Sequence, residues 1–140
     1  MGTTENKRAI TQACAELAEG NGEPFLALMA DDFRWTIIGS TEWSGTYAGR
    51  DTVLEELLQP LFAQFADTYV NTPERLIAEG DHVVVQCRGS VSTRSGRRYD
   101  NTYCWVCRFA DGKLVEMTEY LDTELLGSAL DPPSPAADQG

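Results

Sequence analysis

The fold is decided by residues 99–126, which read YDNTYCWVCRFADGKLVEMTEYLDTELL. Two runs of alternating apolar and polar residues flank the pair Asp111 and Gly112. An Asp-Gly pair between two such runs is typical of a tight β-hairpin. A lone carboxylate, Glu119, stands among apolar side chains in the second run. We therefore expect two long strands here, and we expect any chemistry to centre on Glu119.

The residues before this hairpin supply helices first and more strands afterwards. Apolar residues at helical spacing predict helices over residues 5–19, 23–29 and 51–65, and Pro60 predicts a bend in the last of them. A short strand, 33–38, and a loop, 39–49, separate the second helix from the third. Four long strands are predicted over 69–79, 82–93, 97–109 and 113–121, joined by three successive hairpins.

The chain has the size and composition of one domain with one core. It has 140 residues, of which 42% are hydrophobic. Residues 1–127 are expected to form the domain, and residues 128–140, rich in proline, a disordered tail. Helices followed by an antiparallel meander predict an α+β fold. We expect a cone-shaped, curved antiparallel sheet packed against about three N-terminal helices and enclosing a pocket.

The charge of the chain argues against several partners. The formal net charge is −11, with 22 acidic residues against 11 basic ones, and this repels nucleic acid and anionic membranes. No apolar run approaches the roughly 20 residues that span a bilayer, and the polar start does not resemble a signal peptide. The expected location is the cytoplasm.

The cysteines do not predict a metal or redox site. Cys104 and Cys107 have the spacing of a zinc or redox pair, but residues three apart on a strand point to opposite faces. The chain has only one histidine, His82. We expect four free cysteines, no bound metal and no cofactor.

Three motifs resemble those of the nuclear transport factor 2-like superfamily. They are MADDF at residues 29–33, GTYAGRD at 45–51 and DGKLVEMTEYLD at 111–122. This superfamily of cone-shaped folds includes ketosteroid isomerases, limonene-epoxide hydrolases and SnoaL-like polyketide cyclases. The resemblance covers roughly residues 5–126 and implies a homodimer with a pocket for a small lipophilic molecule.

The match to ketosteroid isomerases is incomplete at two positions. In those enzymes a general base follows the strand entry by a few residues, and Ile37 stands at the matching position here. Their tyrosine on the first helix is also missing, since residues 5–19 contain no tyrosine. The resemblance therefore does not carry over that mechanism in its known form.

The limonene-epoxide hydrolases match more closely. They use a carboxylate on the last strand together with an Arg-x-Asp pair on a middle strand. Glu119 matches the first carboxylate and Arg88 the arginine, whereas Ser90 stands where the aspartate would be. With one carboxylate missing from the acid–base pair, Tyr103 or Tyr47 would have to donate the proton.

The same residues allow two physical interpretations. Burial among apolar groups would raise the pKa of Glu119 toward the range of a general base, and a nearby Arg88 would lower it again. Alternatively, Arg88 and Glu119 form a structural ion pair. The predicted catalytic residues are Glu119, Arg88 and Tyr103, and the predicted pocket residues are Trp35, Ile37, Ser90, Asn101, Trp105, Met117 and Leu121.

Two functional classes remain on this basis. The first is a cofactor-independent enzyme of isomerase, cyclase, dehydratase or epoxide hydrolase type, with Glu119 as the general base. The second is a non-catalytic domain that binds a small ligand or serves dimerisation alone. A homodimer is expected through the outer face of the sheet, for which the candidate residues are Val83, Val85, Cys87, Thr102, Cys104 and Val106.

Overall fold

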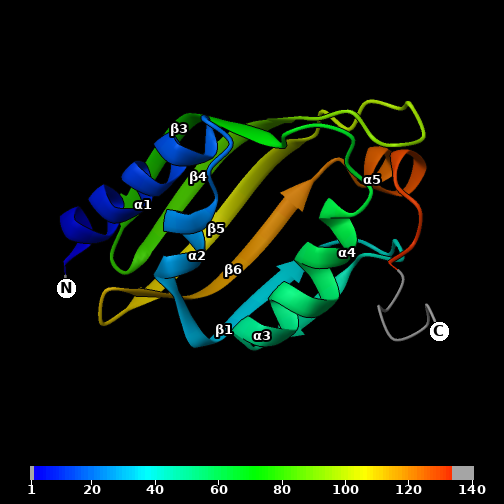
Figure 1. The fold of residues 1–140 in the computed structure, drawn as a ribbon. Coiled ribbons are helices and arrows are strands. Elements are labelled where there is room, and N and C mark those ends of the chain that lie inside the picture. The colour runs from blue at the N-terminus through cyan, green and yellow to red at the C-terminus, as the bar shows by residue number, and fades with distance from the viewer. Residues whose placement is uncertain (1, 134–140) are drawn as a thin grey trace.

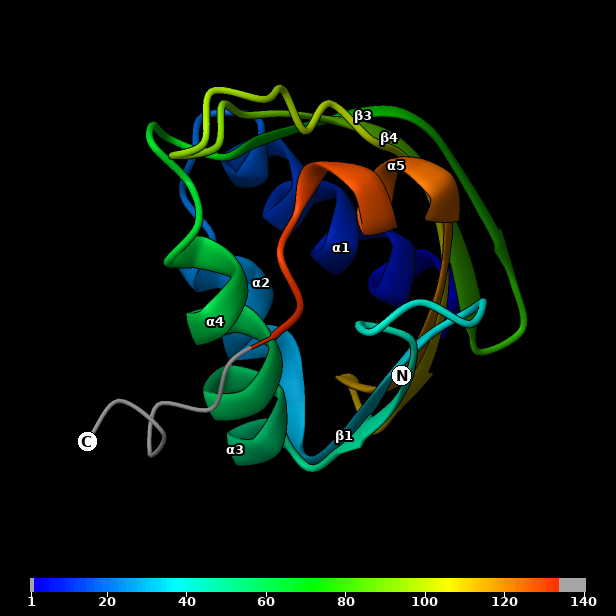
Figure 2. The same cartoon turned by 90° about the vertical axis from the view of Figure 1, so that its right-hand side faces the viewer.

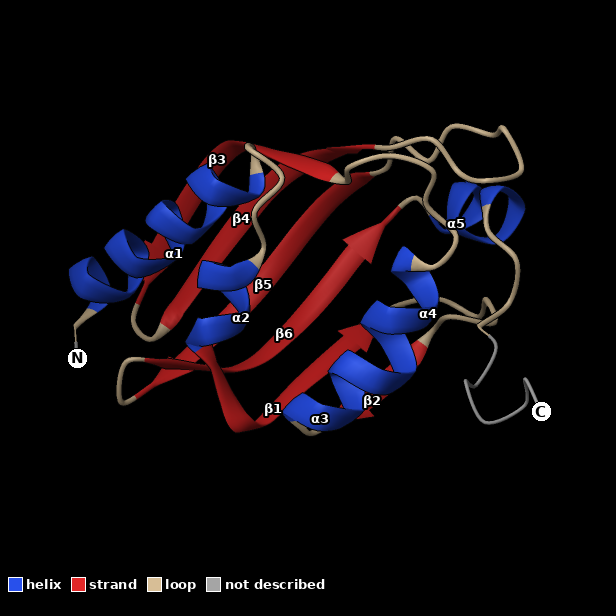
Figure 3. Ribbon diagram, in the orientation of Figure 1, coloured by secondary structure: helices blue, strands red, loops and turns tan. Residues whose placement is uncertain are grey.

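The computed structural model describes residues 2–133 of the chain. It contains one curved sheet of six strands with helices on its concave side (Figures 1 and 3). Among these residues, no helix is long and apolar enough to cross a membrane. The helices are α1 (Thr3–Leu17), α2 (Glu23–Leu28), α3 (Arg50–Thr52), the π-helix η1 (Val53–Leu58), α4 (Gln59–Phe62) and α5 (Thr123–Ala129). The strands are β1 (Met29–Ile37), β2 (Gly45–Ala48), β3 (Val70–Glu79), β4 (His82–Ser90), β5 (Thr102–Ala110) and β6 (Lys113–Leu121).

The strands are ordered β2-β1-β6-β5-β4-β3 across the sheet. Neighbouring strands are antiparallel except for β1 and β6, which run parallel. β1 thus lies beside the last strand of the meander, although β2, the helical segment 50–62 and three strands come between them in the chain. The α+β fold with a curved sheet is confirmed, with one parallel pair in a sheet that was expected to be antiparallel.

The helices cover the concave face from its two sides. α1 buries Ile10, Ala13 and Cys14, which recur at helical spacing, and it packs on β3 and β4. α3 packs on β1, and η1 packs on β2 at the opposite side. Figure 1 shows β6 running between these two groups of helices. The middle of the concave face, formed by β5 and β6, is therefore the region that the helices leave least covered.

The third predicted helix is one continuous helical segment of three elements, α3, η1 and α4. Its turns widen to a π-helix immediately before Pro60. Proline has no N–H to donate to the preceding turn, and local changes of helix type accommodate such positions. The predicted loop 39–49 contains β2, which pairs with β1. A strand of four residues between glycines has too short a pattern to be recognised by alternation.

Two predicted strands are too long at one hairpin. β4 ends at Ser90 and β5 begins at Thr102. The intervening residues form only isolated bridges, Phe65 with Thr93 and Ser92 with Arg98. The second hairpin of the prediction is therefore irregular beyond Ser90. Backbone hydrogen bonds from Tyr99 N–H to the Val91 oxygen and from Thr93 N–H to the Arg97 oxygen still join its two arms, and its tip reaches across to the end of the helical segment.

The assignment of β4 to the two faces of the sheet was wrong. Val83, Val85 and Cys87 are buried, and Cys87 lies directly opposite Tyr103 of β5. Directly paired residues share a face, so these three side chains lie on the concave side, not the outer side. Valine occupies positions 83, 84 and 85, so alternation gave no clue to the direction. The other three candidates, Thr102, Cys104 and Val106, alternate with the buried residues of β5 and do lie on the convex face.

The ordered chain continues beyond the expected boundary at residue 127. Asp122 caps α5 by accepting a hydrogen bond from the backbone N–H of Leu125 at 3.1 Å. α5 extends to Ala129, and Leu130 is buried. Figure 2 shows the following segment passing from α5 toward α4. We call residues 129–131 the C-terminal strap; residues 134–140 of the predicted tail lie outside the described part of the chain.

Candidate active site

A cavity of about 300 Å³ lies between the concave face of the sheet and the helices. The ionisable groups on its wall are Glu119, Asp67 and three tyrosines, and almost all other lining side chains are apolar. Asp67 is exposed, so it lies at the rim, as does Phe62, whose side chain is largely exposed. The apolar lining residues include Phe25, Leu26, Met29, Leu57, Leu58, Leu61, Phe65 and Leu126.

Glu119 is the buried carboxylate of this cavity. It projects from β6 and is 5% exposed. Trp105 on one neighbouring strand donates its indole N–H to Glu119 Oε2 at 2.8 Å. Trp35 on the other neighbouring strand donates to Oε1 at 3.3 Å. The two indoles hold the carboxylate from both sides, and each oxygen keeps a further lone pair that these bonds do not use.

Burial raises the pKa of Glu119 from 4.5 to about 7. Desolvation is the largest cause, because the charged form loses its hydration inside the cavity. The hydrogen bonds from Trp105 and Trp35 act in the opposite direction, since they stabilise the carboxylate. Near neutral pH, Glu119 can therefore both accept and release a proton, which is what a general acid–base group requires.

Three tyrosines form a second polar group on the cavity wall. The hydroxyls of Tyr69 and Tyr103 are directly hydrogen bonded, and Asn101 Nδ2 donates to the Tyr99 hydroxyl at 3.2 Å. Burial raises the pKa of all three phenols, and the charge of Glu119 contributes in the same direction. These hydroxyls are therefore neutral at physiological pH and can act as hydrogen-bond donors.

Most of the predicted pocket residues lie on the cavity wall. Trp35, Ile37, Trp105 and Leu121 line it, together with the predicted catalytic residues Glu119 and Tyr103. Two others are buried beside the cavity. Asn101 contacts the Tyr99 hydroxyl and the backbone of Asp122, and Met117 lies in the core. Tyr47 donates its hydroxyl to the carbonyl oxygen of Trp43 at 2.8 Å.

Arg88 was placed wrongly. Its side chain is 66% exposed, and its Nε lies 3.4 Å from Glu74 Oε2. The neighbours of Arg88 in the chain, Cys87 and Gly89, are buried, so alternation turns Arg88 to the convex face. Glu119 therefore has two indole N–H donors where a guanidinium was expected, and the predicted ion pair does not exist.

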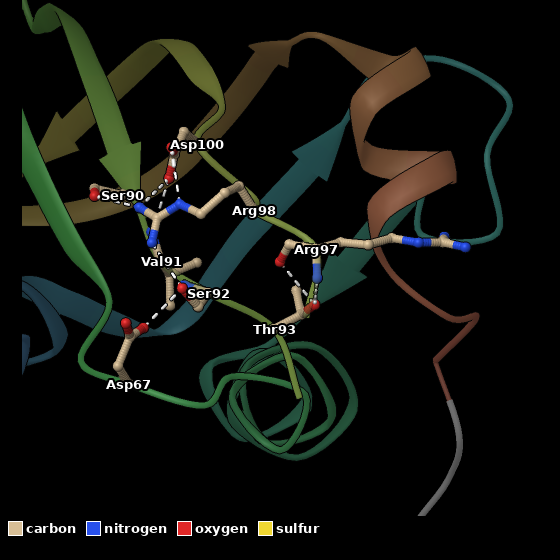
Figure 4. Close-up of polar contacts among 8 residues, drawn as sticks. All are labelled: Asp67, Ser90, Val91, Ser92, Thr93, Arg97, Arg98 and Asp100. Carbon is tan, nitrogen blue, oxygen red and sulfur yellow. Dashed lines mark hydrogen bonds and ion pairs between the residues drawn. The ribbon is translucent and has the colours of Figure 1, made fainter. Parts of the chain in front are cut away.

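Ser90 is exposed on the same side of β4 as Arg88 and does not line the cavity. Arg98 donates from Nη2 to Ser90 Oγ at 2.9 Å and from Nη1 to Ser92 Oγ at 2.7 Å. Its guanidinium also pairs with Asp100, as Figure 4 shows. These contacts fix the loop between β4 and β5, so Ser90 has a structural role there.

Sequence reasoning missed Tyr69, Tyr99 and Asn71 as cavity residues. Asn71 lines the cavity from β3, and its Oδ1 is buried with no hydrogen-bond partner. Tyr69 and Asn71 are two residues apart, which places them on one face of the chain, and this spacing was the available signal. Over residues 2–133, no three His, Cys, Asp or Glu side chains gather closely enough to hold a metal ion.

Comparison with known proteins gives one family and many structural relatives. A family model described as a SnoaL-like domain matches residues 10–117. None of the curated proteins matches the chain. A solved nuclear transport factor 2-like protein from Burkholderia xenovorans LB400 is 26% identical, with a TM-score of 0.71 over 94% of this chain and 99% of the other.

Two further structures are similar in fold. One, from Jannaschia sp. CCS1, carries a provisional assignment as a SnoaL-like polyketide cyclase. It is 21% identical, with a TM-score of 0.74 over 94% of this chain and 95% of the other. The second is TerC co-crystallised with polyporic acid. It is 23% identical, with a TM-score of 0.74 over 89% of this chain and 97% of the other.

Proposed function

The chain belongs to the SnoaL-like family, and we propose that it is a cofactor-independent enzyme in which Glu119 acts as the general base. The observation that carries this proposal is a carboxylate buried in an apolar cavity, with no cationic partner among the described residues and a pKa raised to about 7. Burial of a charge without a cation destabilises a fold, so such a group calls for a functional explanation.

The proposed step is removal of a proton from a carbon next to a carbonyl group. The proton moves to Glu119, and the electron pair of the C–H bond becomes the enolate, with its negative charge on the carbonyl oxygen. Tyr99, whose hydroxyl accepts from Asn101 and keeps its own proton, stabilises that oxygen by hydrogen bonding, which is effective in a site with little water. Glu119 then returns the proton, to the same substrate or at a different carbon.

This chemistry fits the residues better than epoxide hydrolysis. Opening an epoxide requires an acid as well as a base, and the second carboxylate of that mechanism is missing because serine occupies position 90. Enolisation needs one carboxylate and neutral donors, which Glu119 and the tyrosines supply. We therefore favour isomerase, cyclase or dehydratase chemistry.

The substrate class follows from the wall of the cavity. The lining is almost wholly apolar, so an uncharged lipophilic compound is favoured over a sugar or a phosphate. About 300 Å³ is at the lower end of the range for small-molecule sites, which favours a compact ligand. The crystal structure of TerC with polyporic acid supports a small organic ligand in this fold.

Hydrogen exchange at carbon tests the base directly. We would incubate the protein with 2-tetralone in D₂O and follow loss of the proton signals next to the carbonyl by NMR. The wild type should accelerate exchange, and Glu119→Gln should lose about 10²- to 10⁴-fold of that acceleration. Glu116→Gln, a change on the same strand but the opposite face, is the control and should exchange like the wild type.

The second candidate is a domain that binds a small ligand without turning it over. Ile37 and Ser90 favour it, because they stand where related enzymes place carboxylates. If 2-tetralone and other cyclic ketones bind but exchange no faster than in buffer, this alternative replaces the enzyme. Equal exchange by the wild type and Glu119→Gln would exclude Glu119 as the base.

We also propose that the chain forms a homodimer through the convex face of its sheet. Ile77 and Tyr120 are exposed there, near the partly buried Val84 and Val106. Charges of both signs, such as Arg108 and Glu116, border this apolar strip and can pair between two copies. Light scattering should give twice the chain mass for the wild type and the single mass for Ile77→Asp; a monomeric wild type at micromolar concentration would contradict the dimer.

A further inference from the structure

Asn71 is a buried polar group that no part of the proposed mechanism uses. It is 5% exposed, and it lines the cavity from β3. Its Oδ1 atom has no hydrogen-bond partner. A buried oxygen without a donor is destabilising, and such groups in native structures call for an explanation. A ligand that brings a donor to this atom supplies one.

Gly89 lets Asn71, Tyr69 and Tyr103 pack close together. It lies directly opposite Asn71 in the pairing of β3 with β4. A Cβ atom at residue 89 would lie 3.0 Å from Tyr69 Cε1, 3.0 Å from Tyr103 Cε2 and 3.2 Å from Asn71 Oδ1. The amide and the two phenol rings thus gather around Gly89, where any side chain would push them apart.

The hydroxyls of Tyr69 and Tyr103 complete the polar surface. They form one mutual hydrogen bond, which uses one of their two protons. The other phenolic proton is available for a ligand oxygen. The wall at this point therefore offers one acceptor, Asn71 Oδ1, and a hydroxyl donor close to it.

We propose that Asn71, Tyr69 and Tyr103 form a subsite that binds a hydroxyl group of an apolar ring compound. An alcohol or phenol donates its proton to Asn71 Oδ1 and accepts one from the tyrosine pair. An ether or ketone can only accept the tyrosine proton, and it leaves Asn71 Oδ1 without a donor. The inference rests on the proposed function, in that substrate occupies the same cavity, and it adds to that substrate a hydroxyl directed at β3.

Matched ligands separate a hydroxyl site from a merely apolar one. We would measure binding of 2-naphthol and 2-methoxynaphthalene, and of cyclohexanol and methoxycyclohexane, by calorimetry at pH 6. The wild type should prefer each hydroxyl compound over its ether by about tenfold or more, because a site built for a donor rejects the analogue that lacks it. In Asn71→Leu this preference should fall to about one, while affinity for the ethers is kept.

Two control variants identify the contact. Asn71→Leu should unfold at the same temperature as the wild type or higher, since it removes an unpaired oxygen; if it fails to fold, Asn71→Ala replaces it. Glu119→Gln should keep the preference for hydroxyl compounds. Loss of the preference in Glu119→Gln but not in Asn71→Leu would place the hydroxyl on Glu119 and overturn the subsite.

Other outcomes also overturn the proposal. Equal binding of alcohol and ether, a preference for the ether, or failure of both hydroxyl compounds to bind would each do so. A crystal structure with 2-naphthol should place its oxygen within hydrogen-bond distance of Asn71 Oδ1, and a water there instead would contradict it. Because the readout is binding, failure of the subsite is distinguishable from failure of Glu119 in the exchange experiment.

Discussion

Glu116 and Glu119 lie three residues apart on β6 and differ in everything except their side-chain chemistry. Glu116 is on the convex face, partly exposed, and lies 3.2 Å from Arg108 Nε. Glu119 is on the concave face, buried between two indoles, and its pKa is raised to about 7. The face of the strand decides whether a carboxylate is a surface charge or a candidate base, because hydration and partners differ there.

Outside catalysis, the largest effect of this contrast is on how the stability of the fold depends on pH. The folded chain holds the Glu119 proton up to about pH 7, whereas the unfolded chain releases it near pH 4.5. Stability from this group is therefore present below about pH 4.5 and is lost as pH rises to about 7. The loss should be on the order of 3 kcal/mol.

Chemical denaturation of Glu119→Leu and Glu116→Gln at several pH values tests this sign. Between pH 4.5 and 7, stability of the Glu119 variant relative to wild type should improve, whereas that of the Glu116 variant should change little. A Glu119 variant whose relative stability is independent of pH would mean that the folded carboxylate has an ordinary pKa.

The concave face should tolerate added atoms less well than exposed parts of the fold. Gly89→Ala brings a methyl group within 3.0 Å of two tyrosine rings, and overpacking of this kind destabilises by about 1–3 kcal/mol. Gly127→Ala in α5 is the matched control, since its nearest neighbour would be 3.9 Å away. It should be neutral or stabilising in thermal denaturation; equal effects of the two changes would mean that the rings move freely.

The two indole donors should set the pKa of Glu119 to different extents. Trp105→Phe removes the shorter bond and should raise that pKa further, by about one unit. Trp35→Phe removes the 3.3 Å bond and should have a smaller effect. Carbon-13 NMR titration of labelled glutamate measures the pKa of Glu119 in both variants. A larger change of this pKa in Trp35→Phe than in Trp105→Phe would contradict the prediction from the two distances.

The smallest effect is expected on the convex face. Arg108→Ala removes the ion-pair partner of Glu116. This pair lies at the surface, where screening by solvent leaves such pairs little influence on stability. The midpoint of thermal unfolding should not move measurably. A clear drop in the midpoint would mean that this pair stabilises the folded chain despite its exposure.

Periodicity predicted the fold well because its long elements have unambiguous patterns. α1, α2 and the hairpin of β5 and β6 follow from spacing, and Glu119 stood out as a lone carboxylate in an apolar strand. Alternation failed on β4, where three consecutive valines fit either face. That one ambiguity misplaced the candidates for the outer face and allowed Arg88 to be paired with Glu119.

The remaining parts of the site were missed for one physical reason: they depend on contacts between residues that are distant in the sequence. The indole N–H groups of Trp35 and Trp105 meet at Glu119 only because β1 and β5 flank β6, and the parallel pairing of β1 was not foreseen. The convergence of Asn71 with the tyrosines depends in the same way on the register of β3 with β4.

The C-terminal strap links the size of the cavity to the end of the chain. The backbone of Asp131 accepts hydrogen bonds from Trp43 Nε1 and Gln64 Nε2, both at 3.0 Å, and its N–H donates to Gln64 Oε1 at 2.8 Å. Trp43 lines the cavity, so the strap holds one of its walls in place. Insertions or deletions within the strap would thus alter which ligands fit without touching the sheet.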